Sequence, residues 1–291
     1  MSGNILFYIV FLGQILLLSY YFPQKILGRM KSVHEKYPPS KYAKLYPMPV
    51  ENYSIRKWGF KLFSRLILLL GFVILFLIMF VVDHANFADD GYISEVWPAA
   101  YGMIQFLPLI LLEILEFKQF KLMRKANTVT TRKAELHRRR LFDFVSPIVV
   151  GMTVLLLIAA IIFNLSVNDF VIQWGHDSMQ MAMVLTGSNL FLAAMGAWHL
   201  FGRKLDPHQS FADRAKLIKI NLNSLLYVSM AMSVYFMTVA ADDIFDLDFL
   251  GAALLSLYFQ VIAFVSIGHV LRSLQVEDID FEVYKEDISV T

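Results

Sequence analysis

The chain has no cysteine among its 291 residues, which excludes disulfides, thiolate metal ligands and thiol nucleophiles. Its first four residues include no basic side chain, so the apolar segment that follows lacks the basic start of a signal peptide. We therefore expect that segment to remain as a helix. The polar majority of a soluble domain is missing too, because hydrophobic residues make up 57% of the chain and the mean hydropathy is +0.57.

Seven apolar segments can be marked off, each close to the ~20 residues that a helix needs to cross ~30 Å of hydrocarbon. Backbone polar groups inside a bilayer must bond within their own segment, so these segments are predicted to be helices. The sequence thus predicts an all-α, polytopic membrane protein with seven transmembrane helices. The segments are residues 5–22, 66–82, 96–117, 144–163, 179–201, 222–241 and 249–271.

Positive charge is absent from every second connection between these segments. All 26 lysines and arginines lie in residues 23–65, 118–141 and 202–220 and in the tail from 272. The opposite side has ten carboxylates and neither lysine nor arginine. By the positive-inside bias, the N-terminus should lie outside and the C-terminus in the cytoplasm. We expect a multi-pass protein of the cytoplasmic (inner) membrane of a bacterium.

The domain organisation follows from the same pattern. Residues 1–275 are predicted to form one transmembrane domain, and residues 276–291 an acidic cytoplasmic tail. The tail is expected to be disordered, with an extended segment lying on the basic loops as the alternative. Residues 37–49 contain four prolines, which forbid a continuous helix, so we expect an extended strap along the inner face.

One carboxylate near the inner end of the third segment is a candidate for transport. Ionisable groups within a span are costly and usually face the bundle interior or water, which favours a proton or cation site at Glu113. Alternatively, Glu113 and Glu116 both reach the interface and pair with a nearby lysine or with Arg65. Gln105, Asn189 and Gln260 are polar at mid-membrane, where they can line the same path or only bond helix to helix.

Three aspartates on the outer side, Asp242, Asp243 and Asp246, are candidates for binding or attracting cations. Their Asp-Asp-x-x-Asp spacing resembles that of polyprenyl-diphosphate enzymes, a resemblance that implies magnesium and a diphosphate substrate. Those enzymes have a second acidic motif, which is missing here, and their motifs face the cytoplasm. The alternative is that the aspartates reflect topology and solvation alone.

Basic residues between the third and fourth segments are candidates for binding anionic lipid headgroups at the inner face. The alternative is that they only set the topology, and no nucleic-acid partner is expected. These residues are Arg132, Lys133, Arg138, Arg139 and Arg140.

Four histidines raise the question of haem: His84, His176, His199 and His269. His176 and His199 are 23 residues apart on one helix, about 34 Å at ~1.5 Å per residue. That separation is too large for two haems to share one bilayer comfortably, so no cofactor is predicted.

Three functions remain compatible with these patterns. The first is a small transporter or channel subunit for an ion or small solute. A homo-oligomer would favour this first function. The second is an accessory or sensory membrane protein that acts through a protein partner on the cytoplasmic side. The third is a membrane enzyme acting on a lipid or prenyl substrate, although the sequence does not favour an enzyme.

Overall fold

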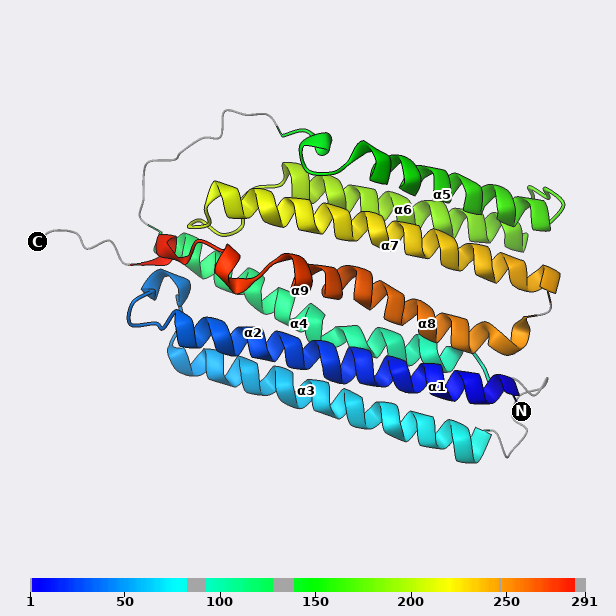
Figure 1. The fold of residues 1–291 in the computed structure, drawn as a ribbon, viewed down its shortest axis with the longest axis horizontal. Helices are drawn as coiled ribbons and strands as arrows, with labels where there is room; N and C mark the ends of the chain where they lie inside the picture. Colours follow the sequence, from blue (N-terminus) through cyan, green and yellow to red (C-terminus); the bar gives the residue numbers. More distant parts are fainter. Residues whose placement is uncertain (1, 83–92, 128–138, 246, 286–291) are drawn as a thin grey trace, which may run out of the picture.

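The computed structural model describes residues 2–82, 93–127, 139–245 and 247–285, and these are helical or irregular throughout. Seven helices, each long and apolar enough to cross a membrane, lie side by side with the two termini at opposite ends (Figure 1). The predicted all-α architecture, with seven helices long and apolar enough to span a membrane, is therefore confirmed. The orientation of the termini in the membrane stays a prediction.

Two of the seven spans are interrupted by π-helical turns and therefore carry two labels each. The elements are α1 (Ser2–Leu16), a π turn (Leu17–Tyr21) and α2 (Phe22–Lys36); α3 (Val50–Leu77) with a π turn at Ile78–Val82; α4 (Val96–Ala126); α5 (Pro147–Val167); α6 (Asp177–Phe201); α7 (Phe211–Phe245); and α8 (Gly251–Ala263), a π turn (Phe264–Gly268) and α9 (His269–Ser273).

Several helices run well past the predicted apolar segments at the end of the bundle that carries the lysines and arginines, which we call the basic end. α2 continues to Lys36, α3 begins at Val50 and α7 begins at Phe211. Hydropathy detects only the part of a helix that lies in hydrocarbon, whereas these extensions are amphipathic and basic. The helices are consequently longer than the bilayer requires.

The helices pack in two groups (Figure 1). The four-helix group comprises the spans α1–α2, α3, α4 and α8–α9. The three-helix group comprises α5, α6 and α7. The packing of α7 against α8 and α9 joins the two groups through the length of the bundle.

The core of the four-helix group is built around Tyr101, whose side chain is fully buried among Phe11, Ile15 and Ile67. Gly71 on α3 makes room for this ring, because a Cβ atom at that position would collide with the Tyr101 hydroxyl and ring. A phenol is therefore enclosed at the centre of the four-helix group.

At the basic end, residues 274–285 fold back onto the bundle. Val276, Phe281 and Tyr284 are buried together with Tyr42 from residues 37–49. The expectation of a disordered tail is wrong for residues 276–285, because apolar side chains alternate with the acidic ones and find an aromatic surface to cover. The tail residues 286–291 lie outside the described part of the chain.

Candidate functional site

A chain of hydrogen bonds links buried polar side chains of α1 and α4. Gln14 Nε2 donates to Gln105 Oε1 at 2.9 Å. Gln105 Nε2 in turn donates to Ser19 Oγ at 2.8 Å and to the Gln14 carbonyl oxygen at 3.2 Å. Each of these three side chains is at most 5% exposed. Two membrane spans are thus joined by paired primary amides in the bundle interior.

The chain continues from Ser19 to α3 through a tyrosine. Ser19 Oγ lies 3.0 Å from the Tyr101 hydroxyl, which donates to the Ile67 carbonyl oxygen at 3.1 Å. Because a phenol has one proton to give, the hydroxyl of Ser19 must be the donor to Tyr101. The donors therefore point in one direction, from Gln14 through Gln105, Ser19 and Tyr101 to the α3 backbone.

Local backbone irregularity places these groups. Ser19 lies inside the π turn Leu17–Tyr21, a kind of turn that is frequent at functional sites. In an ideal α-helix, positions five apart point in clearly different directions, at ~100° per residue, so the turn is what lets Gln14 and Ser19 share a partner. On α4, Pro108 has no N–H and leaves the Ile104 carbonyl oxygen without its helical donor.

One acceptor in this network lacks a donor. Gln14 Oε1 is buried and receives no hydrogen bond from the described residues. A buried acceptor left unsatisfied costs about 1–3 kcal/mol. A small cavity of about 10 Å³ lies beside the network, lined by Ser19, Ser64, Gln105 and Pro108. A cavity of that size is about the smallest that holds a water molecule.

Two of the four transport-path candidates, which lie on different helices, form hydrogen bonds to the same third helix, α1. Gln105 bonds to α1 as described, and Gln260 on α8 donates to the Val10 carbonyl oxygen of α1 at 3.0 Å. Asn189 lies in the three-helix group, where it donates to the Leu185 carbonyl oxygen at 2.9 Å and accepts from Ser229. It is therefore separated from the other polar residues by the division between the groups.

The fourth candidate, Glu113, is exposed on α4, as is Glu116 one turn further along. Within the described residues, neither carboxylate pairs with Lys118, Lys121 or Arg65. The alternative of interfacial ion pairs is thus not realised in this structure. The role of Glu113 in transport stays a prediction.

Sequence reasoning did not single out Ser19 or Tyr101 and gave Gln14 no role of its own. Serine and tyrosine are common at membrane spans, and nothing in their spacing marks them. Only the π turn and the gap provided by Gly71 bring them together. The sequence did contain one signal for this network, namely the primary amides within apolar segments. A buried primary amide has four hydrogen-bonding positions to satisfy and therefore needs polar partners nearby.

At the opposite, acidic end of the bundle, Asp242 lies on α7 and its side chain is partly buried. The side chain of Asp243 and all of Asp246 lie outside the described residues. The residues that can be described contain no group of three or more histidines or carboxylates arranged to hold a metal ion. The cation-binding role of the aspartates stays a prediction.

A carboxylate that sequence reasoning passed over lies at this acidic end. Glu95 precedes α4, and its carboxyl approaches Gly251 at the start of α8 so closely that a Cβ atom there would collide with it. Local loss of water, and next the negative charge of Asp248, raise the pKa of Glu95. Glu95 is thus protonated more readily than an ordinary glutamate.

At the basic end, a cap is formed by the strap (residues 37–49) and the tail segment (residues 274–285). The ring of Tyr37 stacks on Phe281 with centroids 3.8 Å apart, and Tyr42 donates to Glu282 at 3.3 Å. Lys36 forms an ion pair with Glu277. The strap is not fully extended as predicted, because Ala43–Leu45 forms a 3₁₀ turn.

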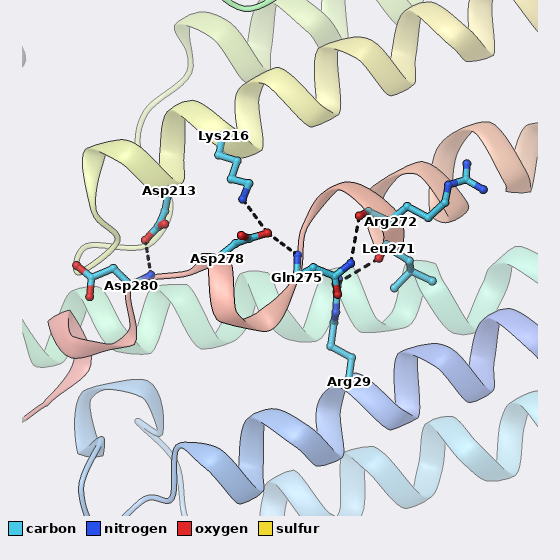
Figure 2. Close-up of polar contacts among 8 residues, drawn as sticks. All are labelled: Arg29, Asp213, Lys216, Leu271, Arg272, Gln275, Asp278 and Asp280. Carbon is cyan, nitrogen blue, oxygen red and sulfur yellow. Dashed lines mark hydrogen bonds and ion pairs between the residues drawn. The ribbon is translucent and has the colours of Figure 1, made fainter.

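The same tail segment also binds the three-helix group (Figure 2). Lys216 on α7 pairs with Asp278 at 2.8 Å, and the Asp280 backbone N–H donates to Asp213 at 3.2 Å. Tyr284 donates to the buried carboxylate of Asp206. Burial, and next the charge of Asp206, raise the pKa of Tyr284. The tail segment therefore bridges the two groups of helices at the basic end.

Of the predicted lipid-binding residues, Arg139 and Arg140 are described, whereas Arg132, Lys133 and Arg138 lie outside the described residues. Arg139 donates to the Leu200 carbonyl oxygen at 3.4 Å, at the end of α6. The Arg140 backbone N–H donates to Asp143 at 2.9 Å.

Three of the four histidines have local partners, and His84 lies outside the described residues. The Ser178 backbone N–H donates to His176 at 3.3 Å, so His176 caps α6. The ring of His199 lies 3.4 Å from the Asn221 amide, and that of His269 lies 3.3 Å from the Ser273 hydroxyl. These partners belong to the same helix or its neighbour.

The chain matches no protein-family model, no curated protein and no solved structure.

Proposed function

We propose that this membrane protein is a small transporter or channel subunit for a cation or a small polar solute. The observation that carries the proposal is the buried hydrogen-bonded chain from Gln14 to Ile67 with its unsatisfied acceptor, Gln14 Oε1. Polar groups inside a membrane are costly, and they commonly mark the pathway of an ion or substrate.

The chemistry of this network suits a hydrogen-bond donor or a hard cation. Amide, hydroxyl and backbone oxygens are the ligands that such ions take in proteins. Transporters commonly coordinate their ions near the bilayer midplane through the carbonyl oxygens of interrupted helices. The π turn at Ser19 and the proline at 108 interrupt two helices at the network. The carboxylates at the acidic end would concentrate cations at the entrance.

The test is flux through the purified protein in liposomes, with potassium, sodium and methylammonium as probes. We expect Gln14→Leu to reduce flux of the transported probe at least about tenfold, since it removes the free acceptor and the link to Gln105. Asn189→Leu is the matched control, because it removes a buried amide from the three-helix group. Its flux should stay within about twofold of the wild type.

Wild-type liposomes that pass none of the three probes would rule out the cation form of the proposal. Equal loss of flux in both variants would show that any buried amide matters for folding. In that case the network would have no special part in transport.

A second candidate function, an accessory or sensory protein acting through a cytoplasmic-side partner, is favoured by the folded cap. The strap and tail segment present an ordered surface of charged side chains, including Glu277 and Lys285. A partner that co-purifies from native membranes and is lost on deleting residues 276–291, with flux absent throughout, would favour this function over transport.

A further inference from the structure

The chain itself ties the two helix groups closely at the acidic end and only loosely at the basic end. α7 ends at Phe245 and the 3₁₀ turn that leads into α8 begins at Asp248, so a very short connection joins the groups there. At the basic end, α4 ends at Ala126 and α5 begins at Pro147, and the chain between them is long enough to leave their separation open. Non-covalent contacts must therefore hold the basic ends together.

The tail segment supplies such contacts to the three-helix group (Figure 2). Asp206, in the loop before α7, and Asp213, in the first turn of α7, are only 7% and 8% exposed. Asp206 accepts the hydroxyl proton of Tyr284, and Asp213 accepts a hydrogen bond from the Asp280 backbone N–H at 3.2 Å. Each carboxylate also accepts a hydrogen bond from its own part of the chain. The acceptors that the tail uses are thus fixed in place locally.

The same segment binds the four-helix group by aromatic packing and charge. Phe281 is buried, and its ring stacks on Tyr37 of the strap with centroids 3.8 Å apart. Glu277 forms an ion pair with Lys36 at the end of α2. A stretch of about ten residues therefore contacts both groups at once, at the end where the chain does not fix their separation.

These contacts can open without unfolding a membrane helix. The tail segment is built from short 3₁₀ turns, Val276–Asp278 and Phe281–Tyr284. Its ion pairs with α2 and α7 involve side chains that are each more than a third exposed to solvent, and exposed ion pairs are individually weak. Segments with many exposed polar contacts are the ones that open locally while the rest of a protein stays folded.

We propose that the tail segment is a detachable clasp that holds the basic ends of the two helix groups together. Its release lets these ends move apart, while the short connection between α7 and α8 keeps the acidic ends joined. Any molecule that binds the released tail would shift the equilibrium toward the open arrangement. The clasp goes beyond the proposed transport function and does not depend on it.

The test measures distances between spin labels on the full-length protein in lipid nanodiscs by pulsed electron paramagnetic resonance. Because the chain has no cysteine, labels go only to cysteines that are introduced on purpose. One pair replaces Glu35 on α2 and Lys219 on α7, which are exposed toward the basic end. A second pair replaces Ile5 on α1 and Ile162 on α5, which are exposed toward the acidic end.

Phe281→Asp should release the clasp, because it places a charge among buried aromatic rings. Hydrogen exchange at backbone amides 276–284 checks that the tail has left. The distance between the labels at 35 and 219 should then become longer, whereas the distance between those at 5 and 162 should stay unchanged. An unchanged distance at the basic end with the tail released would overturn the proposal, since the packing of α7 on α8 and α9 would suffice.

Tyr284→Phe provides a milder variant that keeps the ring and removes the hydrogen bond to Asp206. It should speed exchange at amides 276–284 at least about tenfold, the effect of losing a hydrogen bond to a charged group. Tyr46→Phe is the matched control, because the Tyr46 hydroxyl donates to the Tyr37 carbonyl oxygen within the strap at 2.8 Å. Equal exchange in the two variants, a tail that stays protected in Phe281→Asp, or equal lengthening of both label distances would each contradict the clasp.

Discussion

The four-helix and three-helix groups hold their helices together in different ways. In the four-helix group, one continuous chain of hydrogen bonds crosses three spans, from Gln14 to the backbone of α3. In the three-helix group, polar contacts are separate pairs, such as Ser229 with Asn189 and Asn164 with the Ser178 carbonyl oxygen. The first arrangement specifies the relative positions of several helices at once, whereas the second ties helices two at a time.

The glycines show the same contrast. Gly71 and Gly102 in the four-helix group lie against the side chains of Tyr101 and Phe259, where a Cβ atom would collide. Gly151 and Gly187 in the three-helix group have open space at that position. The contrast holds at these positions and not for every glycine, because Gly28 and Gly59 of the four-helix group also have open space and Gly196 of the three-helix group lies close to Leu222. Glycine is therefore required where aromatic side chains crowd the core of the four-helix group, beside the network that we propose for transport.

The largest expected effect is that of adding a single methyl group at Gly71. Gly71→Ala should destabilise the protein by about 1–3 kcal/mol, because the new Cβ displaces the buried Tyr101 and strains the network. Gly187→Ala should instead be neutral or stabilise α6 by up to ~1 kcal/mol through helix propensity. Thermal unfolding in detergent measures both. Equal effects at the two positions would contradict the difference in packing.

A smaller effect is expected from deleting one buried hydroxyl in each group. Ser19→Ala and Ser229→Ala should each cost about 0.6 kcal/mol of stability and no more than about 1.7 kcal/mol, the mean and the maximum measured for hydrogen bonds between membrane helices. Liposome flux should distinguish the two variants. Only Ser19→Ala should reduce flux, because it breaks the hydrogen-bonded chain between Gln105 and Tyr101. A loss of flux in the Ser229 variant alone would place the pathway in the three-helix group.

The tail segment connects the two groups, and its charged contacts should be weaker still. Lys216→Ala should speed hydrogen exchange at backbone amides 276–284 a few-fold, because it removes the ion pair with Asp278. Lys31→Ala, which removes a surface pair confined to α2, is the control and should leave the tail unchanged. Unaltered exchange in the Lys216 variant would mean that aromatic packing alone holds the tail.

Acid should loosen the tail for the same reason. Hydrogen bonds from Lys216 and Lys36 lower the pKa of Asp278 and Glu277 below their ordinary values of 3.8 and 4.5. A lowered carboxyl pKa contributes stability above the ordinary value, and this contribution is lost as pH falls through the folded-state pKa. Protection factors of the tail amides, corrected for intrinsic exchange rates, should therefore be lower at pH 3 than at pH 7.

The smallest expected effect is that of Glu95→Gln. The raised pKa of Glu95 means that the folded state binds the proton of this carboxyl more tightly than the unfolded state does. The free energy of unfolding should therefore fall as the pH rises from 4.5, the ordinary pKa of a glutamate, through the pKa of Glu95 in the folded state. The variant should lack this fall. Melting temperatures of the two proteins should agree at pH 4, and the variant should melt higher at pH 8. A wild type that melts higher at pH 8 would show that the carboxylate has a partner there.

Much of this protein follows from its sequence. The number of spans is determined by the apolar segments, because a bilayer forces every buried backbone group into a helical bond. The sequence also indicated which primary amides would lie inside the spans, since Gln105 and Gln260 occur in otherwise apolar runs, and the structure has Gln105 buried and Gln260 partly buried. It could not say which of them share a partner, because that depends on how helices rotate and pack against one another.

Tertiary structure decided everything that depends on distant parts of the chain meeting. The π turn at Ser19 changes the face that residues 14 and 19 present, which no periodicity based on a regular helix predicts. The division into two groups separates Asn189 from Gln105, although both occur within apolar segments of the sequence. Tyr42 and Phe281 lie far apart in the chain and pack together only because residues 274–285 fold back onto the bundle. Local pattern determines which segments enter the membrane, whereas side-chain shape and hydrogen bonding determine which of them become neighbours.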